Sequence, residues 1–101
     1  MSFETQGQSE SEIIYGVDKP KRYKVLMHND DYTSMEFVVD VLMNIFRKSE
    51  AEAVRLMHTI HNENYAVCGV YTKEIAETKI EQTTELAREN GFPLKCTMEE
   101  E

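Results

Sequence analysis

Two rows of side chains alternate from residue 22 to residue 28, one of them made of Tyr23, Val25 and Met27. This period of two predicts a β-strand, which the turn-forming run Asn-Asp-Asp-Tyr at 29–32 would end. The run 65–71, Tyr-Ala-Val-Cys-Gly-Val-Tyr, is almost entirely apolar and rich in β-branched and aromatic residues. It predicts a central strand covered on at least one face. A last short strand is expected at 94–98.

Apolar residues recur at helical spacing in the intervening segments. Thr33 and Glu36 have the spacing of a capping box, which predicts a helix from Ser34 to about residue 46. Ser49 and Glu52 repeat that spacing before a second helix, which we expect to end near residue 62.

A third helix is predicted after Thr72, which can cap it. Gly91 is placed to end this helix, and Pro93 prevents it from restarting. The predicted order is therefore β-α-α-β-α-β. An α/β fold of the α+β sandwich type, with a three-stranded antiparallel-type sheet packed against three helices, would bury all the apolar faces together.

The chain divides into two unequal parts. Residues 1–20 are rich in Gln, Ser and Glu, with one small apolar cluster at 13–15, and predict a flexible N-terminal extension. Residues 21–101 carry the regular patterns and are expected to form one core domain.

The composition of the chain argues against several classes of function. A net charge of −8 argues against nucleic acid, whose phosphates repel an acidic surface. The apolar runs are too short to span a membrane, and no leader pattern opens the chain, so we expect a cytoplasmic protein. The two cysteines, Cys68 and Cys96, lack CxxC spacing and are expected to be reduced core residues.

The candidate chemistry lies at Asn29, Asp30 and Asp31, between a strand and a helix. Such residues favour turns and complement a helix N-terminus, but they also offer acceptors for a cation or a primary ammonium. His58 and His61 share a helix face, so a zinc site that also uses His28 and an aspartate is an enzyme-type alternative. The spacing alone does not decide between these possibilities.

Two other features have competing interpretations. Glutamates recur at steps of four in the third predicted helix, at Glu77, Glu81, Glu85 and Glu89. They form either a solvated face or an acidic stripe toward a partner. Neither cysteine lies beside a base or at a helix N-terminus, and no glycine-rich phosphate loop or GxSxG elbow occurs, so a nucleophilic enzyme is not indicated.

Three segments resemble one known family. They are 25–42 (VLMHNDDYTSMEFVVDVL), 66–79 (AVCGVYTKEIAETK) and 93–99 (PLKCTME), and together they resemble ClpS, the bacterial Clp protease adaptor family. The likeness runs from about Tyr23 to Glu99. It implies a small α/β sandwich similar to the C-terminal domain of a ribosomal stalk protein. A stalk-like ribosomal module, which would bind translation factors, is thus a further possibility.

The resemblance implies an adaptor that binds the free first residue (Leu, Phe, Tyr or Trp) of N-degron substrates and delivers them to a ClpA-type AAA+ unfoldase. It implies no catalysis, metal or cofactor, and a monomer. Asn29, Asp30 and His61, supported by Asp31, would hold the α-ammonium. The implied side-chain pocket consists of Thr33, Met35, Val38, Met57, Ile60 and Leu94. Glu74 and Lys79 would dock on the unfoldase, which would also engage the extension before Pro20.

Overall fold

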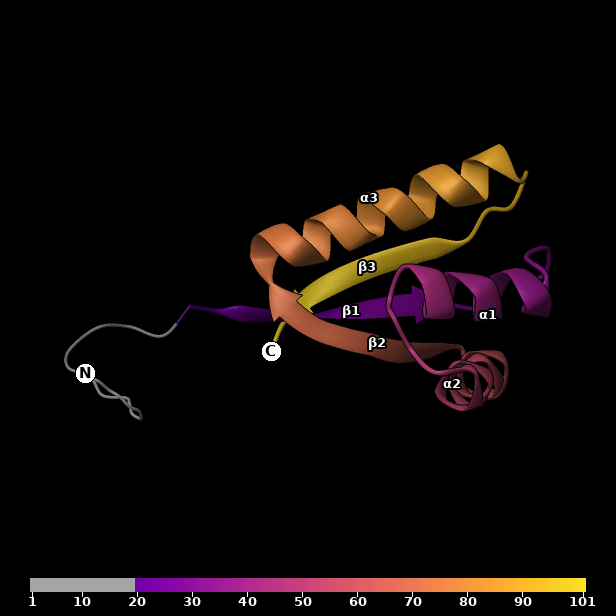
Figure 1. Ribbon diagram of the computed structural model, residues 1–101, viewed down its shortest axis with the longest axis horizontal. Helices are drawn as coiled ribbons and strands as arrows, with labels where there is room; N and C mark the ends of the chain where they lie inside the picture. Colours follow the sequence, from indigo (N-terminus) through magenta and orange to yellow (C-terminus); the bar gives the residue numbers. More distant parts are fainter. Residues whose placement is uncertain (1–19) are drawn as a thin grey trace.

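The computed structural model describes residues 20–101, so the expectations for residues 1–19 lie outside the described part of the chain. Figure 1 shows three strands and three helices in the predicted order. Their bounds are β1 (Arg22–His28), α1 (Met35–Asn44), α2 (Glu50–Glu63), β2 (Tyr65–Thr72), α3 (Lys73–Glu89) and β3 (Lys95–Glu100). The predicted α+β fold class is confirmed.

The sheet has the order β2-β1-β3, and both pairings are antiparallel. The expectation that residues 65–71 form the central strand is therefore wrong, because β1 is central and β2 is an edge strand. The apolar run in β2 does not indicate burial on both faces, because Tyr65, Val67 and Val70 are exposed while Ala66 and Cys68 are buried. The β1–β2 register shifts beside Val25, so β2 holds one residue without a direct partner.

The core lies between one face of the sheet and the helices. Val25 and Met27 of β1 are fully buried there together with Val41 and Leu42 of α1. Figure 1 shows α3 running alongside β3, while α2 lies beside the start of β2. Both cysteines are free and buried, as predicted. Burial raises the pKa of Cys96 to about 12, so its thiol stays protonated at neutral pH.

Side-chain caps fix where the helices begin. Ser34, not Thr33, caps α1, because the Ser34 hydroxyl accepts a hydrogen bond from the Phe37 amide at 3.1 Å. The predicted capping box at Thr33 is therefore wrong by one residue. Ser49 caps α2 as expected and accepts from the Glu52 amide at 3.2 Å. Thr72 occupies the N-cap position of α3 without a side-chain capping bond.

Candidate functional site

The loop between β1 and α1 is organised by one carboxylate. Asp30 Oδ1 accepts hydrogen bonds from the Tyr32 amide at 2.8 Å and from the Thr33 amide at 2.7 Å. Asp30 Oδ2 accepts from the Thr33 hydroxyl at 2.7 Å. The Thr33 hydroxyl thus points to Asp30, while Ser34 provides the cap of α1. Three of the roughly four acceptor positions of this carboxylate are thus taken within the loop.

These bonds keep Asp30 ionised. Burial raises the pKa of Asp30. The hydrogen bonds from the Thr33 hydroxyl and from the Thr33 and Tyr32 amides lower this pKa by more, so it lies below its ordinary value. The loop therefore presents a fixed negative charge at neutral pH. One acceptor position on Oδ2 is left for an outside donor.

A left-handed turn brings the end of α2 to this loop. Asn64, the C-cap of α2, has φ of 79°, a conformation that asparagine tolerates better than most residues. Its amide donates to the Ile60 carbonyl at 2.9 Å, and its carbonyl accepts from the Asn29 amide at 2.8 Å. This last bond ties α2 to the end of β1. His61, in the last turn of α2, consequently lies beside the loop.

A hollow of about 220 Å³ opens where the loop, α1 and α2 meet. Its floor is apolar, since Val38, Met57 and Ile60 are buried, and Met35 stands at its edge with 46% of its surface exposed. Its polar side holds the Asn29–Asp31 run and His61. Nine of the ten residues predicted for ligand binding line it: Asn29, Asp30, Asp31, Thr33, Met35, Val38, Met57, Ile60 and His61.

Leu94 is the exception. It is 5% exposed, belongs to the hydrophobic core and is not part of the lining. Burial alone does not separate Leu94 from the lining, because Ile60 is 3% exposed, belongs to the same core and lines the hollow. A place for Leu94 in the side-chain pocket stays a prediction.

The hollow joins two chemistries in one place. Carboxylate and amide oxygens accept hydrogen bonds, as does a neutral imidazole, so a group with several N–H donors and a positive charge suits its polar side. The apolar floor suits a hydrophobic side chain attached to that group. An amino acid with a free α-ammonium has both parts.

The histidines do not gather. His28 ends β1, and its Nε2 is 2.8 Å from the Thr97 hydroxyl while its ring is 6.2 Å from that of Tyr65. His61 lines the hollow without His28, and His58 is exposed. Within residues 20–101 no three His, Cys, Asp or Glu side chains are grouped as a metal site requires. The donor set of the zinc alternative is therefore not assembled.

The two residues predicted to dock on a partner lie on α3 but differ in their surroundings. Glu74 is exposed in the first turn. Lys79 is half-buried, and its Nζ donates to the Ile45 carbonyl at 2.7 Å. The same Nζ lies 5.9 Å from the Phe46 ring centroid and 5.3 Å from that of Tyr71. Lys79 therefore links α3 to the end of α1 within the fold.

No helix in the described part of the chain combines the length and apolarity needed to cross a bilayer.

Comparison with known proteins identifies the family. The profile of the family described as "ATP-dependent Clp protease adaptor protein ClpS" matches residues 18–97. The adapter protein ClpS of Lawsonia intracellularis (strain PHE/MN1-00) is 50% identical, over 96% of this chain and 89% of that protein. The adapter protein ClpS of Desulfatibacillum aliphaticivorans is 52% identical, over 97% of this chain and 94% of that protein.

A solved structure agrees with these sequences. Agrobacterium tumefaciens ClpS2 bound to L-phenylalaninamide is similar to this chain with a TM-score of 0.80 and 49% identity, over 82% of this chain and 100% of that one. The resemblance seen in the three sequence segments is thus confirmed across the folded core. The chain belongs to the ClpS family of ATP-dependent Clp protease adaptor proteins.

Proposed function

We propose that this protein binds the free N-terminal residue of N-degron substrates, with Leu, Phe, Tyr or Trp in first position, and delivers them to the ClpA-type unfoldase of a ClpAP protease. The main observation that supports this proposal is the hollow, which has hydrogen-bond acceptors on one side and an apolar floor. Its chemistry matches L-phenylalaninamide, the ligand of the A. tumefaciens relative, which has a free ammonium, a phenyl side chain and an amide in place of the next peptide bond.

The α-ammonium is held on the polar side of the hollow. A primary ammonium has three N–H donors and no acceptor, so it requires several acceptors around one point. Asn29 Oδ1, the remaining acceptor position of Asp30 and a neutral imidazole of His61 supply them, and Asp31 adds a second negative charge. Each charge-assisted bond contributes about 1.5–3 kcal/mol.

The first side chain occupies the apolar floor. Burying a Leu or Phe side chain against Val38, Met57 and Ile60 adds roughly 1.5–3 kcal/mol. Together with the ammonium bonds, and less the entropy of association, this yields an affinity on the order of micromolar. Such an affinity suits an adaptor that must also release its cargo.

Delivery uses other parts of the chain. Glu74, exposed at the start of α3, is the first contact proposed for the unfoldase. Lys79 contributes through the two N–H donors that its bond to the Ile45 carbonyl does not use. The N-terminal extension, residues 1–20, is engaged by the unfoldase, and the core domain, residues 21–101, binds substrate. The adaptor acts as a cytoplasmic monomer and catalyses no reaction itself.

Degradation by a purified ClpAP-type protease tests this function. Two fluorescent reporter proteins that differ only in a Leu or a Met as first residue are compared with and without the adaptor. We expect the adaptor to accelerate loss of the Leu reporter alone, and a Glu74→Lys variant to lose this effect while it still binds a Leu-starting peptide. Equal rates for both reporters would contradict the proposed function.

A further inference from the structure

A second hollow lies beside the first, along the groove between α1 and α2. It has a volume of about 220 Å³ and is lined by Met35, Glu36, Val39, Asp40 and Met57. Met35 and Met57 line both hollows, so the two adjoin at these side chains.

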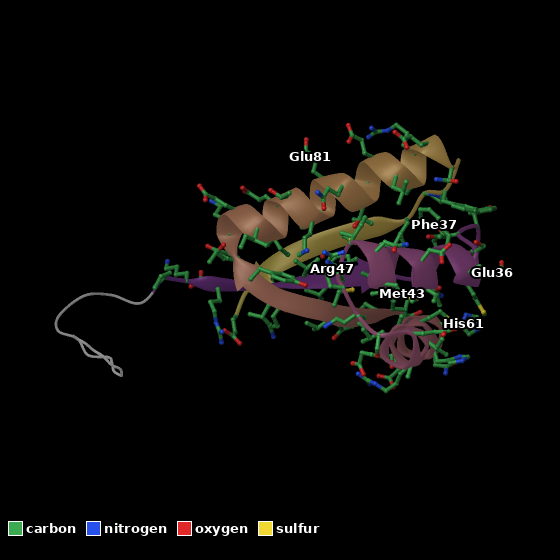
Figure 2. The ribbon with its side chains drawn as sticks, in the orientation of Figure 1. Glu36, Phe37, Met43, Arg47, His61 and Glu81 are labelled. Atoms are coloured by element: carbon green, nitrogen blue, oxygen red, sulfur yellow. The ribbon has the colours of Figure 1, made fainter. Side chains whose placement is uncertain are left out.

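The second hollow has an apolar floor and an acidic rim. Val39 is half-buried and Met57 is buried, while Glu36 and Asp40 are exposed. The two carboxylates are four residues apart on α1 and therefore lie on one face of the helix. Among residues 20–101, neither forms an ion pair. Figure 2 shows Glu36 and His61 toward the same end of the molecule, while Glu81 projects outward from α3.

We propose that this groove binds the side chain of the third residue of a substrate, and that it selects arginine or lysine there. The inference rests on the proposed function, in which the first side chain fills the neighbouring hollow. In an extended chain, residues one and three point to the same side and are about 6.7 Å apart, whereas residue two points away. The two hollows share Met35 and Met57 in their linings, so the side chain of residue three can reach the second hollow when that of residue one fills the first.

The chemistry of the groove matches a long cationic side chain. Arginine and lysine bury an aliphatic stem while the charged head stays near water. Here the stem lies on Val39 and Met57, and the head meets the carboxylates of Glu36 and Asp40. A glutamate in third position would instead face two like charges. Because the ion pairs are exposed, their contribution is modest and is screened by salt.

Peptide binding tests this subsite. Four peptides with the same C-terminal fluorophore begin Phe-Ala-Ala, Phe-Ala-Arg, Phe-Ala-Glu and Phe-Arg-Ala, and fluorescence anisotropy gives their dissociation constants. They are measured with the parent protein and with the double variant Glu36→Gln/Asp40→Asn. The control variant Glu77→Gln/Glu81→Gln changes net charge by the same amount on α3, away from the groove.

We expect the Phe-Ala-Arg peptide to bind about three- to tenfold more tightly than Phe-Ala-Ala, and Phe-Ala-Glu to bind more weakly by a similar factor. The groove variant should lose these differences, the control variant should keep them, and high salt should shrink them. Equal constants for all third residues, or an equal gain from Phe-Arg-Ala, would overturn the subsite while leaving the proposed function intact. Absence of binding by Phe-Ala-Ala would overturn both.

Discussion

Asp30 has two roles that mutations can separate. It organises its own loop, and it is also proposed to bind the ligand ammonium. Two replacements separate these roles. Asp30→Asn removes the charge but retains an oxygen in the position of Oδ1, which accepts from the Tyr32 and Thr33 amides. Asp30→Ala removes every acceptor.

The expected change in stability follows from the three hydrogen bonds. Asparagine keeps the two amide bonds, and its side-chain amide can donate to the Thr33 hydroxyl in place of the third bond. We therefore expect Asp30→Asn to lower the free energy of unfolding by less than about 1 kcal/mol. Asp30→Ala leaves these donors unpaired and resembles the loss of a helix cap, which costs about 0.5–2 kcal/mol.

Binding should respond differently. If Asp30 pairs with the ammonium, the loss of one charge-assisted bond in Asp30→Asn should weaken a Phe-starting peptide by about ten- to a hundredfold. Asp30→Ala should weaken it at least as much. The asparagine variant thus predicts a large loss of affinity without a matching loss of stability.

The lowered pKa of Asp30 adds a pH dependence. A carboxyl whose pKa is lower in the folded state adds stability that is complete above its ordinary pKa. This contribution disappears as the pH falls through the lowered value. Asp30→Asn should therefore unfold with less acid sensitivity than the parent, as measured by circular dichroism in urea at a series of pH values below 5.

Both quantities are measured on the same protein preparations. Urea unfolding gives the free energy, and anisotropy of a labelled Phe-starting peptide gives the affinity. Parental affinity in Asp30→Asn, together with a destabilised Asp30→Ala, would refute a direct role toward the ammonium and leave Asp30 as a loop residue.

Three further changes test other parts of the account. Met35→Ala should allow Val- and Ile-starting peptides to bind, because it truncates the exposed side chain at the edge of the hollow; parental discrimination of Leu from Val would contradict this. Asn64→Gly should preserve stability and affinity, whereas Asn64→Ala should lose about 1–2 kcal/mol of stability at this positive φ and weaken the peptide, as urea unfolding and anisotropy would report. Deletion of residues 1–19 should leave peptide affinity unchanged and abolish delivery, so undiminished degradation of a Leu reporter would remove the extension from the mechanism.

Periodicity and capping residues sufficed for the order and approximate bounds of the elements. Ser49 and Gly91 act as expected, since Ser49 caps α2 and Gly91 adopts a φ of 76° after α3. The place of each strand in the sheet was not predictable in the same way. An apolar run such as 65–71 is typical of a central strand, but here one of its faces remains exposed, and only the tertiary pairing determines that β1 is central.

The functional site was harder to predict from sequence patterns than the fold. Spacing alone left the Asn29–Asp31 run between a turn and a binding site, and the resemblance supplied its partners from α2. Physically, the connection depends on the hydrogen bond between Asn29 and Asn64, which no local pattern reports. The choice of Ser34 over Thr33 as the cap was not predictable either, because both residue types can cap a helix and only the structure shows that Thr33 bonds to Asp30 instead.

The adjoining groove was missed although its signal was present. Met35 and Val39, like Glu36 and Asp40, are spaced by four residues, which places each pair on one helix face. The sequence does not show that these α1 residues line a groove, because the groove also needs Met57 from α2.

The central claim is recognition of a free first residue, and one comparison tests it most directly. A Phe-starting peptide and its N-acetylated form are titrated by anisotropy in the presence of a chelator, so that a metal cannot contribute. The account predicts affinity on the order of micromolar for the free peptide, and at least a hundredfold weaker binding after acetylation, because the charge and its hydrogen bonds are lost. Equal affinities for the two peptides would contradict it.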